Sequence, residues 1–249
     1  MNDNKSSFSS TIPAIAGGLV RNLARPERLR EMAQRFVLEL KSGAGRIPPI
    51  YIGEIEGIDR VEVPSRLQPG TLVSLIAKLI DAREVFEFGT YKGETTMLIA
   101  SHCPNVHVVT LDLPDGTTFS EAQRESPVRV TDEYLFTGNR RGELIVGDPA
   151  SRITQIRMDS GKFDEGEYLG RFDLIYIDAS HSYSAVKSDS EKAFRMIRAG
   201  GTIIWDDYFY PGVWNYLNEL AERRPELALR VFRDWKKVIM PGGLRITRT

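Results

Sequence analysis

Cysteine, net charge and long apolar runs are all scarce in this chain, and each shortage excludes something. The one cysteine, Cys103, cannot form an internal disulfide and fits a reducing compartment, so we expect a cytoplasmic location. The formal net charge of −1 supplies no long-range field for nucleic acid. No apolar run approaches the roughly 20 residues of a membrane span, and the run 12–20 lacks the basic lead of a signal peptide. We therefore expect no nucleic-acid partner and no membrane partner.

The remaining composition is that of a globular protein, with 41% hydrophobic and 27% charged residues over 249 positions. We predict a helical or irregular N-terminal extension over residues 1–68, and one domain over 69–249 with an insertion around 114–147. Residues 26–40 of the extension have helical apolar spacing. Such a segment either covers an active site, builds a homodimer contact or caps one edge of a sheet.

The stretch VFEFGTYKGETTMLIA, residues 85–100, is the centre of the predicted fold. Its apolar start predicts a buried strand, Gly89 and Gly93 predict a tight turn that a ligand can approach closely, and residues 95–100 predict a helix. Open α/β sheets bind ligands at such junctions, at the carboxyl end of a strand. The spacing is not G-x-G-x-x-G, so the dinucleotide fingerprint is absent and a nicotinamide dehydrogenase is disfavoured.

Strands and helices alternate along the rest of the chain. We predict helices over 69–82, 183–197 and 213–223, the second stopped by Gly200 and Gly201. We predict strands over 106–111, 153–158, 171–178 and 202–205, and an antiparallel pair over 227–235 and 237–247. This alternation predicts an α/β fold: a doubly wound, mostly parallel seven-stranded sheet with helices on both faces.

Two regions invite functional interpretations beside structural ones. Asp112 ends the strand 106–111, about 20 residues past the glycine turn, where an acid can accept hydrogen bonds from ribose hydroxyls; the alternative is a turn or helix-capping aspartate. The insertion 114–147 has weak periodicity, which is typical of a functional or irregular segment. It is a candidate lid or substrate loop containing Tyr134 and Phe136, and Arg140 and Arg141 are candidates for an anionic substrate group; a plain surface insertion is the alternative.

Three aspartates follow two consecutive strands of the predicted sheet. Asp178 ends one strand, and Asp206 and Asp207 end the next, so their side chains can meet on the ligand side. Carboxylates that converge repel one another unless a cation binds, and hard oxygen ligands suit Mg²⁺. An acid pair after a strand is otherwise a helix cap and a turn.

Taken in order, these motifs resemble those of class I S-adenosylmethionine-dependent methyltransferases. E-F-G-T-Y-K-G is similar to the E-x-G-x-Y-x-G motif of catechol O-methyltransferase-like enzymes, and D-A-S-H with the later D-D resembles the metal site of those enzymes and of antibiotic-sugar O-methyltransferases. The catechol enzymes have Asn where this chain has Asp207, so the antibiotic-sugar enzymes match better. The resemblance covers about residues 69–208.

The resemblance implies a role for each motif. Asp112 would hold the ribose, Asp159 with Ser160 the adenine (Asp148 is the competing candidate), and Asp178, Asp206 and Asp207 would bind Mg²⁺. His181, three residues after Asp178, would be the general base; it otherwise caps the next helix or orders a carboxylate. The residues implied at the cofactor are Glu87, Gly89, Thr90, Tyr91, Gly93, Thr95, Asp112, Asp159, Ser160 and Asp178.

The expected function is transfer of a methyl group from S-adenosyl-L-methionine to a hydroxyl of a small molecule, a sugar or a phenol by resemblance, with assistance from Mg²⁺. Two alternatives stay open: a methyltransferase acting on nitrogen, carbon or a protein without metal, and a non-catalytic S-adenosylmethionine-binding module. The aromatic residues after the second acidic strand either line an acceptor pocket or belong to the core; they are Tyr208, Phe209, Tyr210 and Trp214.

Overall fold

The computed structural model describes residues 47–50, 54–57, 70–136, 141–232 and 236–245. The predicted helix over 26–40 lies outside the described residues, as do Arg140 and most of the predicted extension 1–68. The side chain of Tyr134 is likewise not described.

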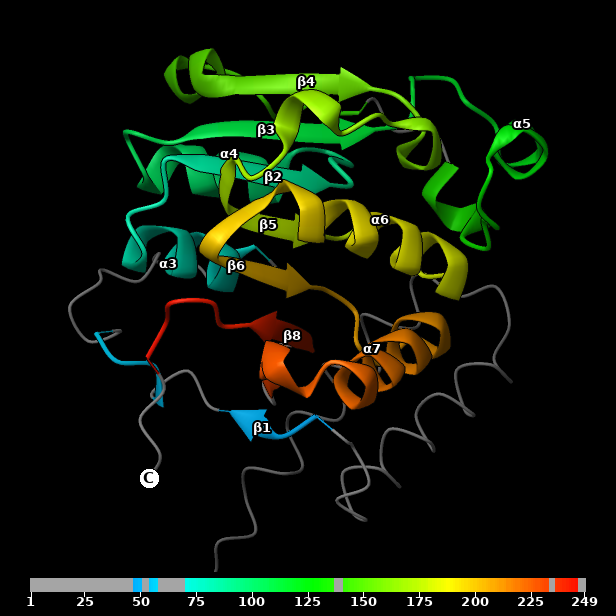
Figure 1. The fold of residues 1–249 in the computed structure, drawn as a ribbon. Coiled ribbons are helices and arrows are strands. Elements are labelled where there is room, and N and C mark those ends of the chain that lie inside the picture. Colours follow the sequence, from blue (N-terminus) through cyan, green and yellow to red (C-terminus); the bar gives the residue numbers. More distant parts are fainter. Residues whose placement is uncertain (1–46, 51–53, 58–69, 137–140, 233–235, 246–249) are drawn as a thin grey trace, which may run out of the picture. The chain divides into compact units, whose positions relative to one another are not determined.

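The described chain is built around one mixed sheet of eight strands in the order β1-β7-β8-β6-β5-β2-β3-β4 (Figure 1). Five of them form the parallel part: β2 (Glu84–Phe88), β3 (His107–Asp112), β4 (Ile153–Arg157), β5 (Phe172–Ile177) and β6 (Ile197–Trp205). β8 (Lys237–Met240) pairs antiparallel with β6, and β7 (Arg230–Phe232) antiparallel with β8. The doubly wound, mostly parallel sheet is therefore confirmed.

One strand was not predicted. β1 (Pro49–Ile50) pairs in parallel with β7 and brings the sheet to eight strands instead of seven. Two residues are too short for an alternating pattern, so the sequence carries no signal for it.

Helices cover both faces of the sheet because side chains along each strand alternate between two cores. Phe86 and Phe88 point to the face covered by α6 (Tyr183–Met196) and α7 (Pro211–Arg223), whereas Val85 points to the face covered by α3 (Thr71–Leu79) and α4 (Glu94–His102). Inside the insertion lie α5 (Phe119–Glu125) and the 3₁₀ turn η3 (Glu133–Phe136). Further 3₁₀ turns are η4 (Asp148–Arg152), η5 (Ser160–Lys162), η6 (Gly166–Tyr168) and η7 (Pro225–Leu227).

The predicted role of Gly200 and Gly201 is wrong. Helix α6 ends at Met196, and β6 begins directly at Ile197 and contains both glycines. The pairing of β6 with β5 shifts register in this stretch, between the pairs Phe172–Ile197 and Leu174–Thr202. Glycine at a strand irregularity is common, and sequence alone does not distinguish it from a helix end.

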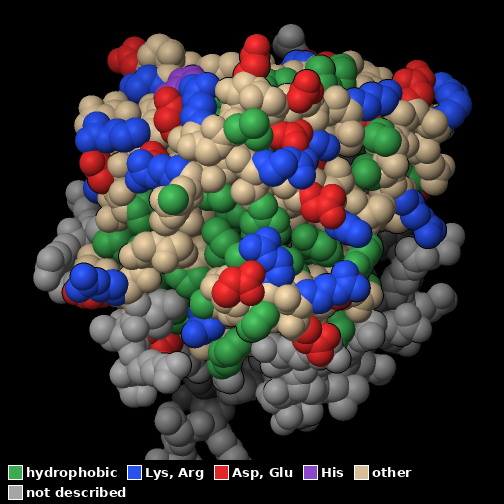
Figure 2. Space-filling model, in the orientation of Figure 1, with side chains coloured by type: hydrophobic (Ala, Val, Ile, Leu, Met, Phe, Trp, Pro, Cys, Tyr) green, Lys and Arg blue, Asp and Glu red, His purple; other side chains and the backbone are tan. Residues whose placement is uncertain are grey.

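The surface shows no large area of one charge on the face seen in Figure 2, where lysines and arginines are interspersed with aspartates and glutamates. Among the described residues, no helix has the length and apolar character to cross a membrane.

Candidate functional site

The turn between β2 and α4 needs glycine at two positions for steric reasons. Gly89 has φ +95°, and a Cβ there would lie 2.1 Å from the carbonyl oxygen of Asp178 on the neighbouring strand end. Gly93 has φ +90°, and a Cβ there would lie 2.6 Å from the Ile145 side chain. Tyr91, between them, also has a positive φ of 46°. The backbone is therefore folded tightly against β5 and the end of the insertion.

Beneath this turn lies a buried carboxylate. Glu87 on β2 accepts hydrogen bonds from the hydroxyls of Thr110 at 2.6 Å and of Thr96, and Thr90 shares a 2.7 Å hydrogen bond with Thr110. Burial raises the pKa of Glu87 to about 7, although both threonine hydroxyls act to lower it. Glu87 thus connects β2 to β3 and to α4 through these hydrogen bonds.

A pocket opens at the carboxyl ends of β2, β3, β4 and β5, the place where open α/β sheets bind ligands. Of the predicted cofactor residues, Gly89, Tyr91, Asp112, Asp159, Ser160 and Asp178 line it, whereas Glu87, Thr90, Gly93 and Thr95 do not. The insertion contributes part of the wall with Ala122, Ser126, Val128, Val130, Phe136 and Arg141. The insertion is therefore part of the site and not a plain surface addition.

Asp112 lies at the wall beside the glycine turn. Its Oδ2 accepts a hydrogen bond from the Tyr91 N–H at 2.7 Å, and its Oδ1 accepts one from the Leu113 N–H at 2.7 Å. Arg141 approaches Oδ1 to 3.5 Å with a side chain that is only 8% exposed. Burial raises the pKa of Asp112, while Arg141 opposes this. Arg141, a candidate for substrate binding, thus pairs with the candidate ribose ligand.

The predicted adenine end is built on η5. Asp159 caps this turn by accepting a hydrogen bond from the Gly161 N–H at 2.8 Å, and Ser160 follows it at the pocket wall. The competing candidate, Asp148, is exposed on η4 and does not line the pocket.

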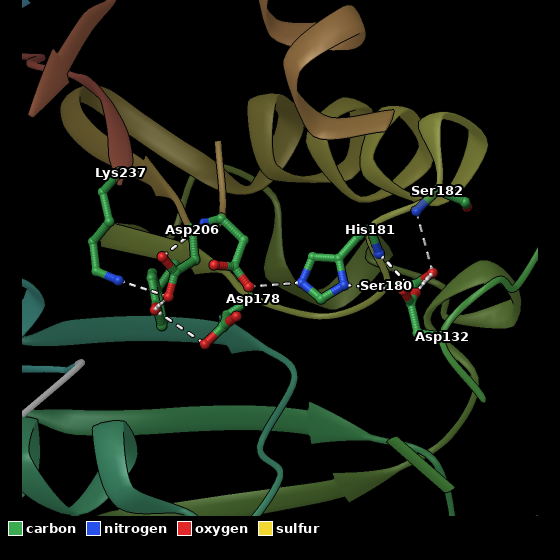
Figure 3. Close-up of polar contacts among 9 residues, drawn as sticks. Asp132, Asp178, Ser180, His181, Ser182, Asp206 and Lys237 are labelled. Atoms are coloured by element: carbon green, nitrogen blue, oxygen red, sulfur yellow. Dashed lines mark hydrogen bonds and ion pairs between the residues drawn. The ribbon is translucent and has the colours of Figure 1, made fainter. Parts of the chain in front are cut away.

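His181 lies between two carboxylates from different parts of the chain (Figure 3). Its Nδ1 is 3.0 Å from Asp132 of the insertion, and its Nε2 is 3.0 Å from Asp207. Asp132 also accepts hydrogen bonds from the His181 N–H at 2.9 Å and the Ser180 hydroxyl at 2.7 Å. The cap of α6 is Ser182, so His181 is not the capping residue.

These partners decide the charge of the imidazole. Burial acts to lower the pKa of His181, but the hydrogen bonds and charges of Asp132 and Asp207 outweigh it and raise that pKa well above its usual value. The same contacts lower the pKa of Asp132 against the effect of its burial. His181 is therefore held as an imidazolium between two aspartates.

Asp206 has its own polar partners within the protein. Its Oδ2 accepts hydrogen bonds from the Tyr176 hydroxyl at 2.5 Å and the Lys237 ammonium at 2.6 Å, and its Oδ1 accepts one from the Asp207 N–H at 2.7 Å. Lys237 reaches this point from β8 and is 3% exposed (Figure 3). Asp206 thus already has a cationic partner supplied by the protein.

The donor atoms of Asp178, His181 and Asp207 all lie within 4.8 Å of one another, which fits a divalent cation. Burial and the charges of Asp206 and Asp207 raise the pKa of Asp178 well above its usual value, as expected where carboxylates converge without a cation. The structure thus brings together Asp178 and Asp207 of the predicted aspartates and adds His181, whereas Asp206 pairs with Lys237. Asp132 behind His181 is the type of partner that orients a metal-binding or catalytic histidine.

The four aromatic residues after β6 divide between site and core. Tyr210 stacks on the His181 ring, with 4.1 Å between centroids and 14° between planes. Tyr208 is buried, and its hydroxyl accepts a hydrogen bond from the Asn218 side chain at 2.9 Å. Trp214 packs against the core, and Phe209 contacts Tyr210.

Sequence reasoning missed three residues of the site: Asp132, Tyr176 and Lys237. In the sequence, Asp132 lies 49 positions before its partner His181, and Lys237 lies 31 positions after its partner Asp206. No local pattern predicts which acid or lysine closes such a contact. Tyr176 lies among the apolar residues Leu174, Ile175 and Ile177 of β5, and a tyrosine in such a run is the one hint that the sequence offers.

The sequence was compared with protein families and with curated proteins. Residues 86–208, just under half of the chain, match the family described as a methyltransferase domain. No curated protein matches the chain.

Several solved structures have a similar chain course. One is a putative caffeoyl-CoA O-methyltransferase from Staphylococcus aureus, at 17% identity and TM-score 0.48, covering 92% of this chain and 97% of that one. Another is the O-methyltransferase TomG from Streptomyces achromogenes, at 17% identity and TM-score 0.46, covering 77% and 87%. A putative O-methyltransferase from Klebsiella pneumoniae has 21% identity and TM-score 0.45, covering 78% and 87%. Likenesses at this level say nothing about the substrate of this chain.

The matched residues 86–208 include the glycine turn, the pocket wall and all the acids of the His181 cluster. They lie on the parallel part of the doubly wound sheet. This segment is therefore similar to a methyltransferase domain.

Proposed function

We propose that this enzyme transfers the methyl group of S-adenosylmethionine to a hydroxyl of a small molecule, with assistance from a divalent cation. The observation that carries the proposal is the position of Asp178. It lines the cofactor pocket and also belongs to the cluster with His181 and Asp207. A methyl donor in the pocket would therefore lie beside a base and a cation site.

The residues suit removal of a proton from a hydroxyl. Alcohol oxygens are poor nucleophiles, and attack on a sulfonium methyl is helped when a base takes the hydroxyl proton. Asp132 accepts the Nδ1–H of His181, so that Nε2 faces the cluster and carries the second proton of the imidazolium beside Asp207. If Asp207 turned to a bound cation, Nε2 would lose its counter-charge and release that proton, and the neutral nitrogen could then take up the proton of the acceptor hydroxyl. When bound by Asp178 and Asp207, a divalent cation such as Mg²⁺ would polarise the acceptor hydroxyl.

The test is methyl transfer to a panel of sugar and phenol acceptors, using S-adenosylmethionine labelled in its methyl group. We expect methyl ethers to form in the presence of Mg²⁺ and to disappear with a chelator. His181→Ala should lower turnover by about 10²–10⁴-fold, the usual contribution of a general base, while binding of the cofactor persists.

The matched control is His102→Ala, because His102 lies at the end of α4 and, among the described residues, its ring bonds only the Leu98 carbonyl of its own helix. It should keep full turnover. Methyl transfer to nitrogen, carbon or a protein that is insensitive to chelator would contradict the proposal and support the metal-independent alternative. Cofactor binding with no transfer to any acceptor class would support the non-catalytic alternative.

A further inference from the structure

Side chains of residues 126–132 in the insertion, here called the wall segment, alternate between the pocket and solvent. Ser126, Val128 and Val130 line the pocket, whereas the residues between them are exposed. Asp132 is 4% exposed and continues the inward series. A period of two is that of an extended chain. The segment that forms part of the pocket wall therefore also carries a buried carboxylate at its end.

The middle of the wall segment is bonded to the start of α6. The Ser182 hydroxyl donates a hydrogen bond to the Arg129 carbonyl, and the Arg129 N–H donates one to the Ser184 hydroxyl at 3.0 Å. Both serines are part of the first turn of α6 or cap it. The wall segment is thus attached to a helix that packs on the sheet.

Asp132 attaches the end of the wall segment to the loop after β5 (Figure 3). Its Oδ2 accepts hydrogen bonds from the Ser180 hydroxyl at 2.7 Å and from the His181 N–H at 2.9 Å. Its Oδ1 lies 3.0 Å from Nδ1 of the His181 ring. Ser180 itself lines the pocket, so Oδ2 joins two parts of the pocket wall. One carboxylate oxygen thus holds the wall and the other holds the imidazole.

We propose that Asp132 is a positioning residue for both the cofactor and the base, a role that rests on the proposed function. Through Oδ2 it holds the wall segment in place as one side of the cofactor pocket. Through Oδ1 it keeps the proton of the neutral His181 ring on Nδ1, which leaves Nε2 to take up the proton of the acceptor hydroxyl. A single side chain therefore couples binding of the methyl donor to orientation of the base.

Asparagine at position 132 should separate the two actions. A backbone N–H can only donate, so the amide oxygen stays beside the His181 N–H and the Ser180 hydroxyl. The amide nitrogen then takes the place of Oδ1 and donates to Nδ1 of the ring. The neutral ring must carry its proton on Nε2, which can no longer accept one from a hydroxyl. Alanine, in contrast, removes every one of these contacts.

The test measures binding of S-adenosylhomocysteine by calorimetry and methyl transfer to a hydroxyl acceptor. Asp132→Ala should weaken binding by about tenfold, the equivalent of one hydrogen bond, and should lower turnover by about 10²–10⁴-fold. Asp132→Asn should bind as the wild type does and lose the same turnover. Adding Asp132→Asn to His181→Ala should lower turnover no further, because the amide acts on turnover only through the imidazole.

The matched control is Glu133→Ala, which changes the next acid in the chain, exposed at the start of η3. It should keep both binding and turnover. Full turnover in Asp132→Asn, or binding of wild-type strength in Asp132→Ala, would overturn this inference alone. If Asp132→Ala does not fold, Asp132→Asn decides, and equal losses of binding and turnover in it would overturn the inference. A wild-type chain that methylates no hydroxyl would overturn the proposed function and this inference with it.

Discussion

Lys237 is a buried residue that the sequence did not predict at the site. It pairs with Asp206, which was predicted to bind a metal ion. Its ammonium bonds Asp206 at 2.6 Å and lies 5.4 Å from the centre of the Tyr176 ring. Buried charges that lose their partner are costly, because the remaining charge has neither water nor a counter-ion. Lys237 is therefore the counter-charge of Asp206.

Replacing this lysine should destabilise the protein strongly. We expect Lys237→Met to lower the free energy of unfolding by about 3–5 kcal/mol, since it strands a buried carboxylate. Urea unfolding at neutral pH measures this. Adding Asp206→Asn to this variant should recover a large part of the lost stability. The control is Lys187→Met, which removes an exposed lysine 3.9 Å from Glu191 and should change the free energy of unfolding by less than about 0.5 kcal/mol. Equal losses for both lysines would contradict the assigned ion pair.

Gly89 is required by its neighbours as well as by its backbone angle. Gly116 provides the matched comparison, because its φ is +80° and no atom of the described residues lies within 4 Å of a Cβ built on it. Gly116→Ala should cost about 1–2 kcal/mol from backbone strain alone. Gly89→Ala should cost more and should also abolish cofactor binding, because its Cβ would displace the Asp178 carbonyl. Thermal unfolding with calorimetry tests both, and similar effects of the two variants would refute the steric argument.

At the scale of elements, Glu87 connects β2 to β3 and α4 in a way that depends on pH. Its pKa is raised from 4.5 to about 7 in the folded protein, so the folded state binds this proton more tightly than the unfolded state. The contribution of Glu87 to stability is therefore largest below about pH 4.5 and falls as the pH rises to about 7. The full difference corresponds to about 3 kcal/mol.

Comparing the wild-type chain with Glu87→Gln isolates this effect from other titrations. The amide keeps an acceptor for Thr96 and Thr110 but cannot ionise. The stability of Glu87→Gln relative to wild type, measured by urea unfolding at pH 5 and pH 8, should rise with pH. A relative stability that does not change between these pH values would show that Glu87 does not titrate in this range.

The sequence predicted elements where the signal is local and failed where it is not. The strand, glycine turn and helix of residues 85–100 appear as β2 and α4, because buried apolar residues and positive-φ glycines specify them within 16 positions. β1 was missed because two residues carry no period, and the end of α6 was misplaced because glycine suits both a helix end and an irregular strand. Contacts such as His181 with Asp132 depend on the folded insertion, which has no pattern of its own.

For the described molecule as a whole, the two ends of the sheet have different roles. At the amino ends of β2 and β5, Asp173 bonds backbone N–H groups and pairs with Arg198, which fastens the strands together. At the carboxyl ends, the glycine turn, Asp112, η5 and the His181 cluster surround one pocket. Parallel strands make this possible because all their carboxyl ends meet at one edge. The central claim is that this edge binds S-adenosylmethionine.

The most direct test is calorimetric titration of S-adenosylmethionine into the full chain, with Mg²⁺ and again with a chelator. We predict saturable binding with one site per chain that survives chelation and that Asp112→Asn weakens by about tenfold. Asp164 is an exposed acid that, within the described part of the chain, bonds only the Gly166 N–H, so Asp164→Asn should bind as the wild type does. No binding of either S-adenosylmethionine or S-adenosylhomocysteine would contradict the account.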